Sequence, residues 1–562
     1  MNSISKFRNS LIFFYFISSC VSAQVLPDST TKKIDQLFEK WPGNNGPGYT
    51  IGIVRNDSLI YSKGYGMANL EYAIPNKPET IYHMASVSKQ FTAYCIMLLE
   101  QQGKLKLDDD VRKYLPWFPD LQKKITILHL LNHTSGIRDQ WDLVVMSGTR
   151  MEDVITQEQI IQLLTRQQAL NFDPGAEYSY SNSNFSMLAE IVKNVSGKSF
   201  RQFVDDVIFK PLGMKDSHIH DNYMEVVTNR AYSYRPLDNV HFANSILNYS
   251  NAGATSLFTN IPDMAKWVIN FYDPKVGNVE TIKKLTTKGI LNNGEKISYA
   301  AGIAVDEYNG KLRFSHNGAD AGYRTAVSVF PDEKLGVIVF SNLSNANPAA
   351  RVGEITDLFI KPLPKAAVAV QKKLDSSFAL ITDTLSVLKY MGNYISDEAV
   401  RFSYKLNGQQ LFWISPGGSF LLAKTQNDTM VMLSNPDVKF LFSTNSTKDT
   451  IVDQYWTGNH RKLVKFNLPT TDPVQLDKEL KEYTGTYYSP ELDTKFSWTL
   501  EKHKLKVTNN KSVNLVLDYI QRDRFASGAY FVNFKRDAAD QISGYEISTG
   551  RVRHLVFTKM GL

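Results

Sequence analysis

The segment that decides the fold spans residues 83–99 and reads His-Met-Ala-Ser-Val-Ser-Lys-Gln-Phe-Thr-Ala-Tyr-Cys-Ile-Met-Leu-Leu. Its dense apolar run has no Pro or Gly before Gly103, a pattern that predicts a buried helix with a glycine stop. Positions i and i+3 share a helix face, so Lys89 Nζ can reach the Ser86 hydroxyl. Burial of this lysine penalises its charged form, so the amine can accept a proton. The segment therefore predicts a nucleophilic serine with its base.

Two further motifs follow at a distance. Ser-x-x-Lys also starts at Ser3, Ser29 and Ser386, so the motif needs support from its surroundings. Tyr180-Ser181-Asn182 precedes a run with helical spacing that stops at Gly197, which predicts that Tyr180 and Asn182 lie on the turn entering a helix. A second copy at Tyr249 reads as a loop and is interpreted as background. The third motif is His316-Asn317-Gly318.

In this order the motifs resemble those of the serine β-lactamases and penicillin-binding proteins, in the class C-like branch with D,D-peptidases, D-aminopeptidases and some esterases. The resemblance covers roughly residues 45–345 and includes the segment 125–136 and the Pro-Leu-Gly-Met turn at 211–214. It implies an α/β (α+β) catalytic domain in which helices flank an antiparallel sheet. We expect this domain to span residues 24–364.

The resemblance also implies a role for each matching residue. Ser86 would be the nucleophile that forms an acyl-enzyme, Lys89 would assist its deprotonation, and Tyr180 would act as general base and then acid. The backbone N–H groups of Ser86 and Ala319 would stabilise the oxyanion. Neither a metal nor an organic cofactor is expected. The residues expected to bind substrate are Asn182, His316, Gly318 and Ala319, with Gly318 leaving room for substrate along the strand edge.

The third motif departs from the lactamase pattern, because the chain contains no Lys-Ser/Thr-Gly. Imidazole is only partly charged near neutral pH, so His316 would hold a substrate carboxylate less permanently than lysine. We therefore expect a hydrolase that acts on peptide or amide bonds in substrates containing D-amino acids, or on esters. The alternatives are a β-lactamase and a sensor that penicillin acylates without turnover. Small peptides, amides or esters would be its substrates, and cell-wall peptides are candidates among them.

Three other histidines could have a role in binding or structure. We expect His133 to be buried and hydrogen-bonded beneath the site. His218 and His220 have a spacing that alone gives little reason to predict zinc, since no Cys or Glu cluster was recognised near them.

The N-terminus predicts export. Lys6 and Arg8 precede an apolar run, and Val-Ser-Ala ends at Ala23, which is typical of a secretory signal over residues 1–23. The alternative is lipidation at Cys20. We expect a periplasmic or secreted protein in either case. Without the signal the formal net charge falls from +7 to +5, and the basic runs are short, so nucleic acid is not an expected partner. No oligomeric state is predicted.

Regular elements can be placed coarsely. Residues 49–66 alternate as two strands joined at Asn56-Asp57, and residues 298–342 predict three or four more, one of which would end at His316. Helical spacing marks 153–168, 184–196 and 261–271. These elements fit a sheet built from both ends of the domain.

After Lys361 an Ala/Val/Lys stretch reads as a linker, and a strand-rich tail with an internal repeat follows. Residues 390–394 match 483–487, and 457–464 match 549–556. Offsets of 92 to 94 residues indicate two duplicated modules, at 365–474 and 475–562. The short alternating segments in each module predict a small antiparallel barrel of about eight strands. The two barrels resemble the lipocalin-like barrels of D-aminopeptidases. The barrels could stabilise the catalytic domain by packing against it, control substrate access, or bind the cell wall. We expect the tail to contribute no residue to the site.

Overall fold

The computed structural model describes residues 26–39, 45–361, 378–380, 383–396, 400–415, 418–425, 429–446, 448–456, 459–467 and 473–561. The predicted signal peptide, with its alternative processing sites at Ala23 and Cys20, lies outside the described residues, as does the predicted linker. None of the helices in the described ranges combines the length and apolar character needed to cross a membrane.

A six-stranded antiparallel sheet forms the centre of the N-terminal domain, which is the expected catalytic domain, in the order β12-β13-β14-β15-β1-β2. The N-terminal pair joins the C-terminal strands where Tyr49 pairs with Ser341. β1, β14 and β15 are almost wholly buried, because helices cover both of their faces. The strands are β1 Tyr49–Arg55, β2 Ser58–Tyr65, β12 Ala304–Tyr308, β13 Lys311–Asp320, β14 Tyr323–Phe330 and β15 Leu335–Ser341.

The predicted strands are present, with one difference in β13. His316 was expected to end its strand, yet β13 continues to Asp320. Residues 317–320 go on pairing with 323–326 of β14, and this hairpin pairing extends the strand beyond the apolar alternation visible in the sequence. His316 therefore lies in the middle of a strand.

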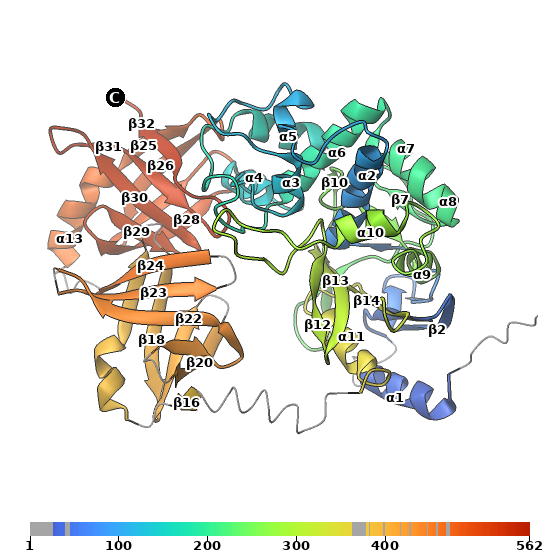
Figure 1. Ribbon diagram of the computed structural model, residues 1–562. Helices are drawn as coiled ribbons and strands as arrows, with labels where there is room; N and C mark the ends of the chain where they lie inside the picture. The colour runs from blue at the N-terminus through green and yellow to red at the C-terminus, as the bar shows by residue number, and fades with distance from the viewer. Residues whose placement is uncertain are drawn as a thin grey trace, which may run out of the picture.

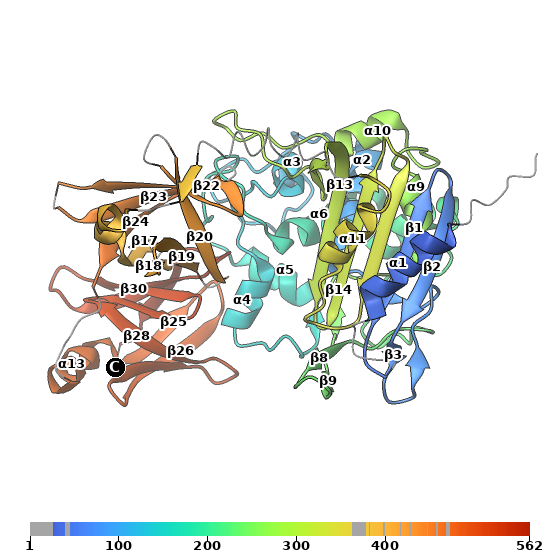
Figure 2. The same ribbon diagram turned by 90° about the horizontal axis from the view of Figure 1, so that it is seen from below.

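Helices cover the sheet on both sides, as Figure 2 shows. α1 Asp28–Glu39 and α11 Pro348–Thr356 lie on one face, and α2 Lys89–Gln101, α6 Asn182–Ser196 and α9 Ile261–Ile269 on the other. Phe91 of α2 stacks on Trp267 of α9 with ring centroids 4.2 Å apart, which ties these two helices together in the core. The other α-helices of this domain are α3 Ile127–Leu131, α4 Gln140–Met146, α5 Gln157–Thr165, α7 Phe200–Val204, α8 Lys210–Leu212 and α10 Val279–Leu285.

A small sheet lies beside the start of α2. Its order is β5-β11-β7, formed by β5 Tyr82–His83, β11 Leu257–Thr259 and β7 His218–Ile219. β5 leads directly into the turn that carries Ser86. The remaining short strands are β3 Met67–Asn69, β4 Ile74–Pro75, β6 Ile155–Thr156, β8 Tyr234–Pro236, β9 Phe242–Asn244 and β10 Tyr249–Ser250.

Two barrels follow the catalytic domain. In the first, β17 to β24 close into a ring because β20 pairs with both β19 and β21, and β16 adds at β20. Its strands are β16 Phe378–Leu380, β17 Gly392–Ser396, β18 Arg401–Asn407, β19 Gln410–Ser415, β20 Gly418–Thr425, β21 Met430–Met432, β22 Asn435–Thr444, β23 Thr450–Trp456 and β24 Asn459–Phe466.

The second barrel closes through β25 to β32. Its strands are β25 Gly485–Ser489, β26 Thr494–Glu501, β27 Lys504–Thr508, β28 Asn514–Gln521, β29 Arg524–Ser527, β30 Tyr530–Arg536, β31 Ile542–Ser548 and β32 Leu555–Lys559. Helix α13 Pro473–Leu480 precedes it. The repeat is visible in matching contacts: the Tyr394 and Tyr487 hydroxyls each donate to the carbonyl oxygen four residues before, at 2.9 Å in both barrels.

The second barrel packs against the catalytic domain (Figure 1). Arg138 is fully buried and pairs with Glu491 at 2.5 Å between Nη1 and Oε2. Arg138 Nη2 also donates to the Arg553 carbonyl oxygen at 2.9 Å, and the Arg553 side chain pairs with Glu177 at 3.0 Å. Figure 2 shows α4 and α5 between the barrels and the six-stranded sheet.

Candidate active site

Ser86 lies on a tight turn. A 3-10 turn, Ala85–Ser88, precedes α2, and Ala85 has a φ of +48°, a left-handed conformation that is strained for a residue with a side chain. Thr325 Oγ1 of β14 donates to the Met84 carbonyl oxygen at 2.9 Å and fixes the turn against the sheet.

Gly318 packs directly against the turn that carries Ser86. A Cβ at this position would lie 2.3 Å from the Met84 carbonyl oxygen and 2.3 Å from Thr325 Oγ1. The missing side chain therefore lets the turn that carries Ser86 approach β13.

Lys89 is fully buried next to the serine. Its Nζ lies 3.1 Å from Ser86 Oγ and 2.8 Å from both Asn182 Oδ1 and the Ala254 carbonyl oxygen. Burial is the main cause that lowers the pKa of Lys89 to about 7; Asp320 and Asp139 act against it, and Arg551 adds to it. Near neutral pH a large share of this amine is unprotonated.

Asp139 orients the amide that holds the lysine, and sequence reasoning missed it. Its buried Oδ2 accepts from Asn182 N at 2.6 Å and from Asn182 Nδ2 at 2.8 Å. Since Nδ2 is the donor, Oδ1 of Asn182 must face Lys89. No local motif marks Asp139, because its partner is 43 residues away.

Tyr180 lies above the lysine. Lys89 Nζ is 4.9 Å from the centre of its ring. The Tyr180 hydroxyl is buried and makes no hydrogen bond of good geometry within the described ranges, although Ser86 is close enough to lower its pKa slightly. Burial has the larger effect and raises the pKa of Tyr180, so the phenol is protonated at neutral pH.

His133 lies beneath this tyrosine as expected. It is fully buried, its ring centre is 4.2 Å from that of Tyr180, and its Nδ1 accepts from Ser181 N at 3.2 Å. The second Tyr-Ser-Asn copy is placed elsewhere: Tyr249 is buried on β10 and packs at a tilt against Trp141, without lining the pocket.

His316 differs from the expectation of a partly charged group. Burial and the Lys89 charge lower the pKa of His316 to about 3. Its Nδ1 lies 2.7 Å from the Asn317 carbonyl oxygen, so Nδ1 donates, and Nε2 accepts from the Tyr299 hydroxyl at 2.9 Å. The imidazole is neutral at physiological pH and cannot serve as a cationic clamp.

A cavity of about 540 Å³ joins these groups. All the residues expected at the site line it except Lys89, which lies beneath Ser86. The lining includes Ser86, Trp141, Tyr178, Tyr180, Asn182, Tyr299, Ser315, His316, Gly318, Ala319, Asp320, Arg324 and Arg551.

Arg551 comes from the second barrel, so the expectation that the tail contributes nothing to the site is wrong. Its guanidinium carbon lies 5.2 Å from the centre of the Tyr180 ring. Asp139 N donates to the Arg551 carbonyl oxygen at 3.2 Å, which fixes the segment between β31 and β32 at the cavity. Sequence reasoning identified this segment only as part of a repeat, because its docking partner is distant in the chain.

The arrangement can carry out acyl transfer. A serine hydroxyl and a protonated phenol line one cavity, and a buried amine that is partly unprotonated near neutral pH lies beneath the serine, next to backbone N–H groups at the start of a turn and on a strand. Consistent with this geometry, a family model described as Beta-lactamase matches residues 34–359, more than half of the chain. The chain belongs to the β-lactamase family.

Relatives in the β-lactamase family include named enzymes. The D-aminopeptidase from Brucella ovis is 30% identical over 329 residues, which cover 58% of this chain and 62% of the relative. The D-aminopeptidase from Gluconobacter oxydans is 26% identical, with the same coverage. The chain thus matches less than two thirds of the length of these relatives.

Solved structures show the same β-lactamase-like fold. The octameric penicillin-binding protein homologue from Pyrococcus abyssi has a TM-score of 0.52 at 23% identity, covering 77% of this chain and 98% of its own. The D-amino acid amidase from Ochrobactrum anthropi SV3 has a TM-score of 0.51 at 20% identity, covering 59% and 99%.

Proposed function

We propose that this protein is a serine hydrolase that cleaves amide bonds in small substrates through an acyl-enzyme on Ser86. The observation that carries the proposal is the position of Lys89: its fully buried Nζ lies 3.1 Å from Ser86 Oγ, and both of its other partners can only accept hydrogen bonds. The D-aminopeptidase relatives support amides as the substrate class.

Acylation begins with a proton transfer to Lys89. When the amine is neutral, its two N–H groups donate to Asn182 Oδ1 and the Ala254 carbonyl oxygen, so its lone pair faces the Ser86 hydroxyl. The amine takes the hydroxyl proton as Ser86 Oγ attacks the substrate carbonyl carbon. Backbone N–H groups of Ser86 and Ala319 stabilise the negative oxygen of the tetrahedral intermediate.

Tyr180 supplies the proton that the leaving amine needs. Its phenol is protonated at rest, because burial raises its pKa, and its hydroxyl is close to Ser86. It gives its proton to the leaving nitrogen and regains one from the Lys89 ammonium. In deacylation the same pair accepts a proton from the attacking water and returns it to Ser86 Oγ.

The cavity supports a preference among substrates. Arg551 and Arg324 bring two guanidinium groups to the cavity, while His316 is neutral. Trp141 and Tyr178 add aromatic walls. We propose small peptides or amides that carry a carboxylate and an apolar side chain, with D-amino acids favoured on the strength of the relatives' names. Cell-wall peptides and esters are candidates to be compared with them.

A labelled fluorophosphonate tests the nucleophile. We expect the label on Ser86, and Ser86→Ala should lose both label and turnover. Ser315→Ala is the matched control, because Ser315 lines the same cavity without contacting Lys89. Label that persists in Ser86→Ala would overturn the proposal.

A panel of D- and L-aminoacyl amides, D-Ala-D-Ala peptides, short esters and nitrocefin tests the substrate class. A sensor would stop after one equivalent of acylation, whereas a hydrolase continues. Turnover of nitrocefin above all amides would favour a β-lactamase instead.

We also propose that the protein is exported, on the strength of the signal-like residues 1–23. Mass spectrometry of the mature protein should find Gln24 at its N-terminus, or a lipidated Cys20. An intact Met1 on protein recovered from the cytoplasm would contradict export.

A further inference from the structure

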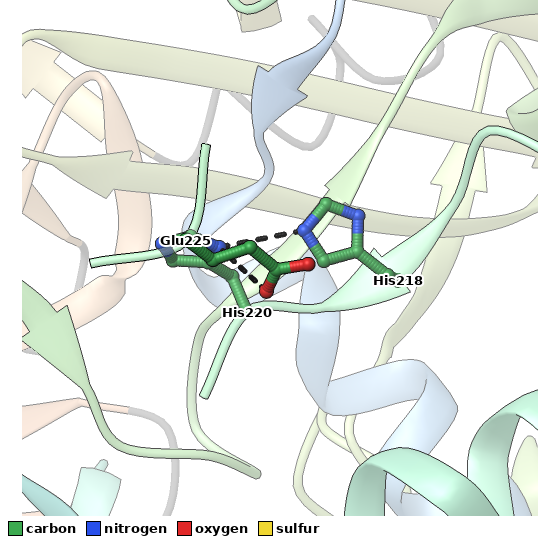
Figure 3. A group of neighbouring side chains, drawn as sticks. All are labelled: His218, His220 and Glu225. Carbon is green, nitrogen blue, oxygen red and sulfur yellow. Dashed lines mark hydrogen bonds and ion pairs between the residues drawn. The ribbon is translucent and has the colours of Figure 1, made fainter. Parts of the chain in front are cut away.

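Three potential metal ligands, none of which lines the cavity, converge at the end of β7 (Figure 3). His218 Nε2 lies 3.4 Å from His220 Nδ1, and Glu225 Oε2 lies 3.7 Å from the same His220 nitrogen. All three ligand atoms are within 4.8 Å of one another. The two histidines are two residues apart in an extended segment, so their side chains project to the same side, and Glu225 approaches from the segment that follows.

These separations suit a tetrahedral zinc ion. Zinc–nitrogen bonds of about 2.0–2.1 Å place two ligand nitrogens about 3.3 Å apart at the tetrahedral angle. The observed 3.4 Å between the imidazole nitrogens matches this value. Glu225 Oε2, which is 3.7 Å from His220 Nδ1 and within 4.8 Å of His218 Nε2, must move toward the ion to complete the geometry.

We propose that His218 Nε2, His220 Nδ1 and Glu225 Oε2 form a zinc site separate from the acyl-transfer site. Two imidazoles and one carboxylate leave a fourth position for water. The ion would tie the segment after β7 to the sheet β5-β11-β7.

Arg201 and Arg230 are cations that act against metal binding; Arg201 contacts the ligand Glu225 itself, and its geometry leaves that ligand available. Its Nη1 donates to Glu225 Oε2 at 2.6 Å and its Nη2 to Oε1 at 2.8 Å. Each carboxylate oxygen has two lone pairs, so Oε2 keeps one that can face the metal. Asp221 lies 3.2 Å from the same guanidinium and offsets part of its charge. Arg201 thus holds the carboxylate in place, as hydrogen-bond partners of metal ligands commonly do.

The site is connected to the turn that carries Ser86. Phe258 of β11 contacts the His220 ring at 4.5 Å and the His83 ring at 5.2 Å between ring centres. His83 in turn lies 2.9 Å from Asp320, which lines the cavity. A bound ion would therefore stiffen the sheet behind the nucleophile without touching substrate.

Calorimetric titration of the chelator-treated full chain with Zn²⁺ alone tests the proposal. We expect one equivalent to bind and the melting temperature to rise. His218→Gln and Glu225→Gln should each weaken zinc binding at least about tenfold. The matched control is His241→Gln, since His241 also pairs with a carboxylate, Asp238 at 2.8 Å, but lies outside the cluster.

Absence of zinc uptake by the wild-type chain at millimolar zinc would overturn the site, as would unchanged binding in both variants or an equal loss in His241→Gln. If His218→Gln does not fold, as judged by its melt in chelator, Glu225→Gln decides alone, because its amide can still accept from Arg201. Ser86 labelling in the same samples separates this result from the proposed hydrolase activity.

Discussion

Replacing Arg551 by methionine removes a positive charge from the cavity and keeps a long side chain in its place. Arg551 lowers the pKa of Lys89, because a nearby cation favours the neutral amine. Its loss must therefore raise that pKa above about 7. Only neutral Lys89 can accept the Ser86 proton, so the rise of activity with pH should move to higher pH.

The size of the shift follows from two distances. Lys89 Nζ and the Arg551 guanidinium carbon lie 4.9 and 5.2 Å from the centre of the Tyr180 ring, which puts the two charges within about 10 Å of each other. At that separation Coulomb's law gives about 0.4 kcal/mol in bulk water and about 1.7 kcal/mol at an effective dielectric constant of about 20, or about 0.3 to 1.2 pKa units. Because 46% of the Arg551 side chain is exposed, we expect the lower half of this range.

The assay is kcat/KM for a neutral chromogenic ester between about pH 5.5 and 9, which reports the pKa of the free enzyme's base. A neutral substrate avoids any direct attraction to the guanidinium. Arg551→Lys is the control, since it keeps the charge and should keep the wild-type profile. If the pH at which kcat/KM rises is unchanged in Arg551→Met, or is lower than in the wild type, the electrostatic reasoning is refuted.

Three further outcomes are expected. Tyr180→Phe should lower the single-turnover acylation rate by about 10²–10⁴, whereas Tyr178→Phe, which lines the same cavity, should have a much smaller effect; equal effects would remove Tyr180 from proton transfer. Because the pKa of His316 is about 3, the pH profiles of the wild type and of His316→Gln on a carboxylate-bearing peptide should agree near pH 6.5. An inflection near pH 6.5 that is present in the wild type and absent from the variant would show that the imidazole titrates there. Glu491→Ala should destabilise the docked second barrel by about 3–5 kcal/mol in thermal or denaturant melts, since it leaves buried Arg138 without its carboxylate. Asp493→Asn removes the charge from an exposed pair with Arg166 and tolerates the φ of +50° at this position, so it should cost at most about 1 kcal/mol; similar losses in both variants would contradict the difference in burial.

Much of the fold could be predicted from local patterns. The strands at 49–66 and 298–342 and the helices around α5, α6 and α9 have apolar periodicities that a short window reveals. The Ser86–Lys89 contact is equally local, because helical geometry joins positions three apart. The two barrels could be recognised as duplicated modules because matching segments recur at a nearly constant offset along the sequence.

The missed features depend on contacts between distant segments. Arg551 reaches the cavity only because the second barrel docks through Arg138, and Glu225 joins the two histidines through the path of one loop. Burial likewise decides the charge of His316, and burial is a property of the packed molecule. Gly318 could be recognised as part of the motif. The reason that a glycine is needed there became clear only from the position of the Met84 carbonyl oxygen.

The contact between Asp139 and Arg551 also links completion of the cavity to folding of the second barrel. Arg551 is synthesised after every other residue that lines the cavity, and the segment whose backbone carbonyl accepts from Asp139 N is held between the paired strands β31 and β32. A nascent chain therefore holds serine, lysine and tyrosine long before it holds a finished cleft. Maturation of the pocket is coupled to folding of the second barrel, so the hydrolase would gain its full substrate recognition only once that barrel has folded.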